Sequence, residues 1–298
     1  MVAVVSTIIV NFNAGQLLRK CVASLLDCPL KIEIIVVDNA STDGSLDTLD
    51  SSPAITIIRN NRNLGFSAGC NIGIKTATAE HILFLNPDCS FTPGTVKKLL
   101  DYLQVHKEVG MVGGLLVGPD GMEQGGGRRA MPTPWRTLVR ATGLTRFSNR
   151  WPRLFEDFYL HKQPLPKKPI EVEAISGACM LVKRKALEDV GLWDEGYFLH
   201  CEDLDYCMRF RRSGWQIAFV PDARIVHEHG FCSRSRPIFV EWHKHKGMMR
   251  FYRKFFRHQY PGLLMWLVTL GVWLRFSIVA IGYYSVKWVS QILGFKRG

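Results

Sequence analysis

Short apolar runs alternate with helix-like stretches over the first part of the chain, and this alternation constrains the fold more than any other feature. The runs cover residues 4–10, 32–37, 54–59, 81–85 and 111–118. Amphipathic or small-residue stretches typical of helices separate them. Parallel strands need long crossover connections, which are usually helices and are almost always right-handed. The sequence therefore predicts an α/β fold with a mostly parallel sheet flanked by helices.

The alternation fails between residues 119 and 169, where Gly, Pro and Arg dominate and no period holds. We expect an ordered but mobile excursion here, with one helix near residues 135–144. The pattern returns with a strand over 172–184 and another over 215–227. We assign these segments to a first domain that covers residues 1–236.

The C-terminal residues 237–298 have a different composition and are predicted to form a separate part. A basic and aromatic helix comes first. Residues 261–295 follow and are predominantly apolar, with only two charges, Arg275 and Lys287. A bilayer crossing needs about 20 apolar residues, so the length suffices, but the two charges divide the segment. Its Trp and Tyr residues are types that favour the membrane interface.

We therefore predict that this tail is a monotopic anchor at the membrane surface, with a re-entrant helix pair as one form of it. A basic helix with an aromatic face, such as the one that precedes the apolar segment, is typical of interfacial binding. The alternative is that the apolar residues pack on the first domain or on another subunit, which would make the protein a homo-oligomer.

The formal net charge is +12 and is unevenly distributed. Residues 234–297 carry twelve Lys or Arg against one acid, and a second arginine-rich set runs from Arg128 to Arg153. Such patches indicate an anionic partner, either nucleic acid, acidic lipid or phosphate. No recognised nucleic-acid-binding motif is present, and the basic tail leads directly into an apolar segment. The sequence therefore favours lipid and phosphate over nucleic acid.

The cysteines and the N-terminus indicate a cytosolic compartment. The eight cysteines form no CxxC pair, and a disulfide framework is not expected in a chain of this length. The N-terminal MVAVVSTIIVNFN lacks the basic region and cleavage site of a signal peptide. We expect reduced cysteines and a first strand at the N-terminus.

Acidic residues follow two of the predicted strands directly. Asp38 begins the segment DNASTDGS after the second strand, and Asp88 follows the run HILFL. Ligands of α/β sheets bind at the carboxyl ends of the strands, so these acids suggest a nucleotide site. No glycine-rich phosphate loop is present. A divalent cation on Asp88, Mg²⁺ or Mn²⁺, could neutralise the phosphates instead.

A second set of candidates lies in the C-terminal half of the first domain. Glu202 and Asp203 begin a predicted helix, where acids can simply complement the helix dipole. Asp203 follows an aromatic, Gly-containing loop, and a carboxylate there could deprotonate a hydroxyl. The segment VHEHG ends a strand with two histidines, one of which could complete a metal site begun by Asp88. Arg234 and Arg236 could reach a diphosphate.

Seven segments in order give the chain a resemblance to a known family. They are IIVNFNAGQLLRKCVASL, IIVVDNASTDGS, NRNLGFSAGCNIGI, LFLNPD, SGACMLVKR, GLWDEGYFLHCEDLDYCMRFRRSGW and VHEHG. Together they resemble the inverting family-2 glycosyltransferases, which have the GT-A fold. Within that family the chain looks most like the bacterial rhamnosyltransferases that build O-antigen and cell-wall linkers.

The resemblance implies roles for residues of the donor site. Asp38 matches the residue that reads the nucleobase, and Phe12 matches the aromatic residue that packs on that base. Asn63 and Asn71 match polar residues that line the nucleotide pocket. Asp88, in Asn86-Pro87-Asp88, matches the acid left from the metal-binding DxD-type motif.

The resemblance also implies which residues carry out the reaction. Asp203 matches the general base, with Glu202 beside it, and His227 matches the late metal ligand. The family pattern His-x-x-Gly-Gly-x-Ser reads HEHGFCS here, so His229 is the alternative ligand. Arg128, Arg129 and Arg234 are predicted to contact the acceptor and its diphosphate.

The activity implied is metal-dependent transfer of a single sugar, since the QxxRW signature of processive synthases is absent. The donor expected from the resemblance is dTDP-rhamnose, and the acceptor is a sugar on a polyprenyl diphosphate. GlcNAc, galactose and mannose stay open as alternative sugars. The expected location is the cytoplasmic face of the bacterial inner membrane.

Overall fold

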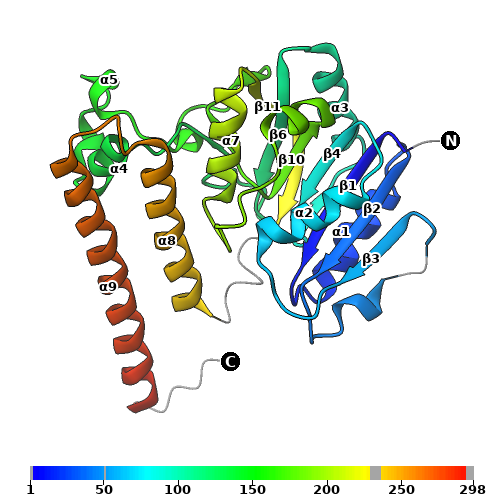
Figure 1. The fold of residues 1–298 in the computed structure, drawn as a ribbon, viewed down its shortest axis with the longest axis horizontal. Coiled ribbons are helices and arrows are strands. Elements are labelled where there is room, and N and C mark those ends of the chain that lie inside the picture. The colour runs from blue at the N-terminus through cyan, green and yellow to red at the C-terminus, as the bar shows by residue number, and fades with distance from the viewer. Residues whose placement is uncertain (1–2, 50–51, 229–235, 293–298) are drawn as a thin grey trace.

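The computed structural model describes residues 3–49, 52–228 and 236–292. Its centre is a nine-stranded sheet in the order β3-β2-β1-β4-β10-β6-β11-β5, with β8 paired to β11 (Figure 1). The strands of this sheet are β1 (Val5–Asn11), β2 (Ile32–Asp38), β3 (Ile55–Arg59), β4 (His81–Leu85), β5 (Cys89–Phe91), β6 (Val109–Val117), β8 (Ile170–Glu171), β10 (Cys179–Lys183) and β11 (Gln216–His227).

The sheet is mostly parallel, as predicted. Strands β3, β2, β1 and β4 run parallel to one another, and β6 runs parallel to β11. Strand β10 is inserted between β4 and β6 and is antiparallel to both. Because the parallel strands end on one side, the segments that follow β1, β2 and β4 meet at a single edge of the sheet.

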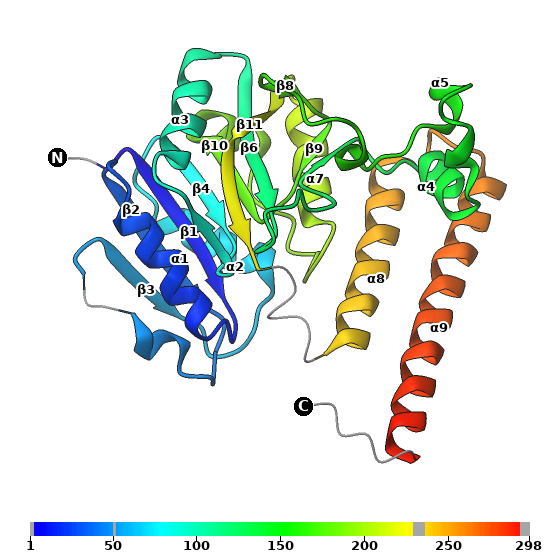
Figure 2. The same ribbon diagram turned by 180° about the vertical axis from the view of Figure 1, so that it is seen from behind.

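Helices cover both faces of the sheet (Figures 1 and 2). Their bounds are α1 (Gln16–Leu26), α2 (Phe66–Thr76), α3 (Thr95–Val105), α6 (Arg184–Val190) and α7 (Glu202–Arg212). Side chains of β1 alternate between two cores, as the period of a strand requires. Ile8 and Val10 join α2, α6 and α7 in one core, and Val5 and Ile9 join α1 and α3 in the other.

The small residues of α2 explain how closely it lies on β1. A Cβ atom built on Gly73 would lie 2.4 Å from the Ile8 side chain, and one on Gly69 would lie 2.7 Å from Val10. Glycine is therefore needed at both positions, since a Cβ atom would push the helix away from the sheet.

The segment 119–169 contains more regular structure than the single helix that we predicted. It holds β7 (Arg128–Arg129), α4 (Pro134–Ala141), η2 (Leu144–Phe147), α5 (Pro152–Phe155) and η3 (Leu160–Lys162). An ion pair between Arg136 and Glu173 at 2.9 Å attaches it to the residues that follow, and one between Arg140 and Asp157 at 2.5 Å joins parts of the segment itself. The predicted helix is α4, and the remaining elements are too short to leave a periodic pattern.

The predicted strand over 172–184 is two strands. It divides into β9 (Ala174–Ile175), which pairs with β7, and β10, which joins the central sheet. The residues between them, 176–178, form a turn at the sheet edge. The break is not apparent in the sequence, because only Ser176 and Gly177 interrupt an otherwise apolar segment.

Two long helices form the C-terminal part, α8 (Pro237–Phe255) and α9 (Gly262–Ile292), and they lie side by side in both views (Figures 1 and 2). Met249, Phe251 and Phe255 of α8 are buried in the same core as α7, so α8 is packed on the α/β domain. Residues 262–286 are long and apolar enough to cross a membrane and are little buried. The described part of this segment is one unbroken helix, not a re-entrant pair.

Candidate active site

The carboxyl edge of the sheet gathers polar side chains from four strands. Asn11 and Asp38 are the last residues of β1 and β2 and face each other in register. Asp88 lies in the turn after β4, and His227 is the last residue of β11. All four are buried, so their polar atoms depend on one another or on a ligand.

Asp38 is held by a hydrogen-bond network at this edge. Asn11 Nδ2 donates to Asp38 Oδ1 at 2.8 Å, and the Ser41 amide donates to Oδ2 at 3.0 Å. The same Asn11 amide also lies 2.9 Å from Ser45 Oγ. The turn after β2 is therefore folded back onto the carboxylate and fixes its orientation.

The other residues predicted for a nucleotide pocket differ in their surroundings. Phe12 is half-buried directly after β1. Asn63 accepts a hydrogen bond from the Gly65 amide at 2.9 Å, just before α2. Asn71 is buried and exchanges hydrogen bonds with the Trp193 backbone at 2.9 and 3.0 Å. Because these bonds occupy its amide, Asn71 joins α2 to the loop before α7, a role that the sequence did not indicate.

Asp88 and His227 lie together at this edge of the sheet. His227 Nε2 is 3.3 Å from Asp88 Oδ1, and Cys89 lies beside them. Gln124 Oε1 lies 2.7 Å from His227 Nδ1, and Gln124 Nε2 donates to the His227 carbonyl at 2.7 Å. A proton on Nδ1, donated to Gln124 Oε1, is the tautomer that would present the Nε2 lone pair to a metal ion beside Asp88.

These donors fit a hard divalent cation. Among the described residues, Asp88 Oδ1 is buried and has no hydrogen-bond donor. An orphaned carboxylate oxygen next to an imidazole nitrogen is a favourable pair of ligands for a metal ion. Cys89 Sγ contacts the Ala178 carbonyl oxygen at 3.5 Å, which leaves the carboxylate and the imidazole as the natural ligands.

Asp203 lies in the first turn of α7 and is bonded to Arg129. Arg129 Nη2 donates to Asp203 Oδ2, and the Gly177 amide donates to the same oxygen at 3.2 Å. The turn 176–178 also reaches the Asp88 segment, since the Ala178 carbonyl accepts from the Asn86 amide at 2.9 Å. A single short turn therefore brings the Asp88 and Asp203 segments to the same edge of the sheet.

Glu202 is next to Asp203 but is in a different environment. Its carboxyl group is buried, and Oε2 has no partner among the described residues. Burial, and then the charge of Asp203, raise the pKa of Glu202 to about 8. Glu202 is therefore largely protonated near neutral pH.

The backbone is strained just before the first turn of α7, which carries Glu202 and Asp203. His200 and Cys201 have φ values of 67° and 68°, in the left-handed region that residues with a Cβ atom rarely adopt. Strain of this kind persists only where the surroundings impose it, and it often lies at functional sites. Here it directs the first turn of α7 toward the sheet edge.

The three arginines predicted to contact a diphosphate do not share one environment. Arg128 is 2% exposed and is bonded to Glu123 at 2.8 Å and to the Gln163 carbonyl at 2.8 Å. This placement differs from the prediction, because burial and the bonds at Nε and Nη2 leave little of the guanidinium for a diphosphate. Arg129 is bonded to Asp203. Arg234 and His229 lie outside the described residues.

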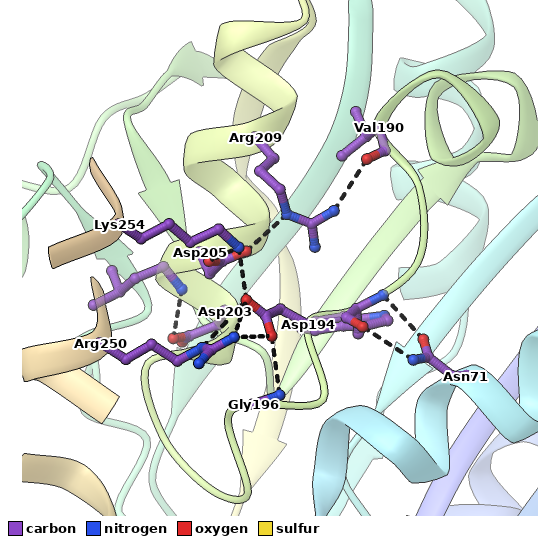
Figure 3. Close-up of polar contacts among 11 residues, drawn as sticks. Asn71, Val190, Asp194, Gly196, Asp203, Asp205, Arg209, Arg250 and Lys254 are labelled. Carbon is purple, nitrogen blue, oxygen red and sulfur yellow. Dashed lines mark hydrogen bonds and ion pairs between the residues drawn. The ribbon is translucent and has the colours of Figure 1, made fainter. Parts of the chain in front are cut away.

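A charge cluster behind α7 attaches α8 to the site (Figure 3). Asp194 accepts hydrogen bonds from Arg250 at 2.8 Å and from Lys254 at 2.7 Å. Asp205, which is fully buried, pairs with Lys254 at 2.6 Å and with Arg209 at 2.7 Å. Partial burial opposes ionisation of Asp194, but the bonds from Lys254 and Arg250 outweigh it and lower the pKa of Asp194 to about 2. The loop before α7, α7 itself and α8 thus form one unit.

Gln124 and Gly177 are site residues that sequence reasoning missed. Gln124 lies in the Gly-rich segment EQGGG, and its partner His227 is far away in the chain. A Cβ atom on Gly177 would lie 3.2 Å from Asp203 Cβ, so a larger residue there would crowd the carboxylate. The one signal was Ser176-Gly177 inside an apolar run, which indicates close approach of the backbone to another group.

Comparison with known proteins gives consistent similarities. Residues 6–191 match the profile of glycosyl transferase family 2. N-acetylglucosaminyl-diphospho-decaprenol L-rhamnosyltransferase of Mycobacterium tuberculosis is 29% identical over 240 residues, which are 76% of each chain. The dTDP-rhamnosyl transferase RfbF of Shigella flexneri is 25% identical over 74% of this chain and 67% of its own.

Solved structures share the fold. The mannosyltransferase PcManGT of Pyrobaculum calidifontis, in complex with GDP-Man and Mn²⁺, has a TM-score of 0.59 at 15% identity and covers 96% of this chain and 76% of its own. GalNAc-T7, with UDP, GalNAc and Mn²⁺, has a TM-score of 0.54 at 17% identity over 76% of this chain and 44% of its own. At these identities the likeness concerns the fold, which is that of GT-A enzymes.

Proposed function

The chain belongs to glycosyl transferase family 2, and we propose that it is an inverting enzyme that moves one L-rhamnosyl residue from dTDP-rhamnose to a polyprenyl-diphosphate-linked sugar. The glycosyltransferase activity follows from the family. The donor, the acceptor and the roles of individual residues are the parts that we propose.

One observation carries the proposal. The Asp88–His227 pair and the Asp203 carboxylate are brought to the same sheet edge by the turn 176–178. Such an edge can hold the donor diphosphate on one side and an ionised base on the other. In-line displacement of a nucleoside diphosphate by a hydroxyl needs this combination.

In the reaction that we propose, Asp203 accepts the proton of the acceptor hydroxyl. The hydroxyl oxygen forms a bond to the anomeric carbon while the bond from that carbon to the diphosphate oxygen breaks. The nucleoside diphosphate leaves with the electron pair, and the configuration at the anomeric carbon is inverted. We assign nucleobase recognition to Asp38, which ends β2, and to Phe12, which follows β1.

Asp88 and His227 are the residues that would hold a divalent cation, Mg²⁺ or Mn²⁺. When bound, the cation would supply Lewis-acid stabilisation of the charge on the diphosphate. Gln124 would orient the His227 ring through Nδ1, as groups around metal ligands commonly do.

The rhamnosyl donor is supported by the relatives named for this sugar, and the lipid-linked acceptor is supported by the mycobacterial relative. We expect the purified protein to add one deoxyhexose to polyprenyl-diphosphate-GlcNAc when dTDP-rhamnose is supplied, as measured by mass spectrometry. The kcat/KM for dTDP-rhamnose should exceed that for UDP-GlcNAc, UDP-galactose or GDP-mannose at least about 100-fold, because polar pocket groups reject mismatched sugars. If the enzyme instead prefers one of those donors, the assignment of rhamnose as the donor sugar is wrong.

We also propose that α9 holds the enzyme on the cytoplasmic face of the membrane by lying along the surface. Trp242 of α8 contacts Trp273 and Phe276 of α9, with ring centroids 5.0 and 5.5 Å apart. A perpendicular crossing by α9 would therefore carry the charged side chains of α8 into the hydrocarbon, which is costly. In this proposal residues 1–236 carry the chemistry and residues 237–298 carry the membrane contact, with α8 joining the two.

The outer face of α9 offers the lipid contact. Its exposed apolar residues recur at helical spacing: Leu263, Leu267, Leu270, Leu274, Ile278 and Ile281. Helix α5 lies near the start of α9 (Figure 1). This helix and the residue before it carry exposed Leu154 and Trp151, with Arg146 and Arg150 close by in the chain. In the described part of the chain these two arginines form no ion pair, so they can pair with anionic headgroups.

Acidic residues on this face should release the enzyme from membranes. In a variant with Leu270→Glu, Leu274→Glu and Ile278→Glu, each position loses about 1.5 to 3 kcal/mol of apolar burial. Partition into anionic vesicles should fall at least about 1,000-fold, since 1.4 kcal/mol is a factor of ten. Transfer to a lipid-linked acceptor should fall, while dTDP-rhamnose binding stays unchanged in calorimetry.

Methionine at the same three positions is the matched control and should stay bound to vesicles, because it keeps the apolar area and adds no charge. High salt alone should not extract the unmodified enzyme, since apolar contacts persist when charges are screened. Vesicle binding by the triple Glu variant, or full extraction of the unmodified enzyme by salt, would rule the anchor out.

A further inference from the structure

We infer that Arg129 is a positioning residue for the base: it fixes one oxygen of the Asp203 carboxylate and keeps that carboxylate charged, so that the other oxygen can take the acceptor proton. This inference rests on the proposed function, in which Asp203 is the base. It replaces the sequence prediction that Arg129 contacts the acceptor diphosphate.

The Arg129 backbone is fixed before its side chain makes any contact. Strand β7 pairs antiparallel with β9, with Arg129 opposite Ala174, and Arg129 also forms a bridge with Tyr159 on its other side. The Ser176 amide then donates to the Gly127 carbonyl at 3.1 Å, which attaches the turn 176–178 to the same ribbon. Arg129 and the turn that carries Gly177 therefore approach Asp203 as one rigid element.

The two oxygens of the Asp203 carboxylate have different hydrogen-bond partners. Oδ2 accepts from both Arg129 Nη2 and the Gly177 amide. Oδ1 accepts only from the Leu204 amide, at 2.8 Å, among the bonds of the described residues. An ionised carboxylate offers about four acceptor positions, so Oδ1 keeps capacity for the acceptor hydroxyl. Arg129 Nη2 is itself anchored on the Ile175 carbonyl at 2.9 Å, which fixes the direction of the pair.

The burial of Arg129 favours this role over ligand binding. The Arg129 and Asp203 side chains are each 14% exposed, whereas a residue that clamps a mobile lipid diphosphate must present its guanidinium to solvent. Burial opposes the charge of Arg129, yet the charge of Asp203 and their hydrogen bond raise its pKa above the usual value. The pair is therefore a charged one whose members stabilise each other.

Other ionisable groups lie near the Arg129–Asp203 pair and contribute to the pH profile of the enzyme. They are Glu202, Cys201 and Cys207 around Asp203, Tyr159 beside Arg129, and Lys244 and Arg211 close to the cysteines. Glu202 opposes a charged Asp203, and burial keeps the thiols of Cys201 and Cys207 protonated by raising their pKa. Arg129 is the group among these that donates a hydrogen bond to Asp203, so its removal should dominate the change.

The test is the pH profile of kcat/KM for Arg129→Met and Arg129→Lys. An opposite charge next to a carboxylate shifts its titration by about 1 to 3 pH units. The acid limb, the part of the profile where activity falls as the pH is lowered, should therefore move to higher pH by that amount in Arg129→Met. In Arg129→Lys it should return most of the way to its position in the unmodified enzyme. The KM for the lipid-linked acceptor, measured above the limb, should stay within about twofold of the unmodified enzyme, since the inference assigns Arg129 no contact with it.

The outcomes separate this inference from the proposed function. If both variants keep the acid limb of the unmodified enzyme, the inference is wrong. If Arg129→Met raises only the acceptor KM, Arg129 contacts the acceptor and the inference is likewise wrong. Should Arg129→Met fail to bind dTDP-rhamnose and so prove unfolded, Arg129→Gln takes its place, since Gln keeps a hydrogen-bond donor but carries no charge. An acid limb of Arg129→Gln at the same pH as that of the unmodified enzyme would overturn the inference. Normal transfer by Asp203→Asn would instead overturn the base assignment and this inference with it.

Discussion

Replacement of Asp203 by Asn should lower kcat for sugar transfer by about 10²- to 10⁴-fold, which is the range that a positioned general base contributes. Asn keeps the size of Asp203 and its contact with the Gly177 amide, but it cannot accept the proton of the acceptor hydroxyl. Binding of dTDP-rhamnose, measured by calorimetry, should change little, because the proposal assigns Asp203 to the acceptor hydroxyl and not to the donor. Single-turnover kinetics would separate the chemical step from binding.

The neighbouring Glu202 gives a matched control from the same turn of the same helix. Its pKa is raised to about 8 by burial and by Asp203, so the group is mostly neutral near pH 7. Glu202→Gln should therefore keep kcat within about tenfold of the unmodified enzyme, since Gln imitates a protonated Glu. A larger loss in Glu202→Gln than in Asp203→Asn would reverse the two assignments.

The sequence predicted the parts of the fold and site that depend on local pattern. The ends of β2 and β4 could be located because buried parallel strands are short apolar runs, and their carboxyl ends share one edge. Asp38 and Asp88 were found in this way. The proximity of His227 to Asp88 was implied by the family resemblance, and the structure places these residues together.

What the sequence could not predict is the pairing of residues far apart in the chain. Arg129 and Asp203 are separated by 74 positions, and Asn71 and Trp193 by 122. In the sequence Arg128 and Arg129 are equivalent, yet β7 directs one toward Glu123 and the other toward Asp203, because neighbouring side chains of a strand point to opposite faces. The burial of α8 in the core of α7 was likewise hidden by its basic composition.

Removing the Asp88 carboxylate should produce the second large effect. Asp88→Asn keeps the shape of the turn after β4 but lacks the charge that, in our proposal, holds a divalent cation beside His227. We expect kcat/KM to fall about 100- to 1,000-fold, which corresponds to the loss of several kcal/mol of charge stabilisation at the leaving diphosphate. Addition of EDTA to the unmodified enzyme should cause a loss of at least that size, reversed by Mn²⁺ or Mg²⁺.

A readout independent of turnover makes the assignment specific. Titration of the enzyme with Mn²⁺ in the presence of dTDP, followed by electron paramagnetic resonance, should show tight binding in the unmodified enzyme and weak binding in Asp88→Asn and His227→Ala. Cys89→Ala is the matched control, because Cys89 lies beside both residues but directs its sulfur to the Ala178 carbonyl. Equal Mn²⁺ affinity in Asp88→Asn and Cys89→Ala would mean that the cation, if bound, is held elsewhere, and that the buried Asp88 oxygen is a structural acceptor that lacks a partner for another reason.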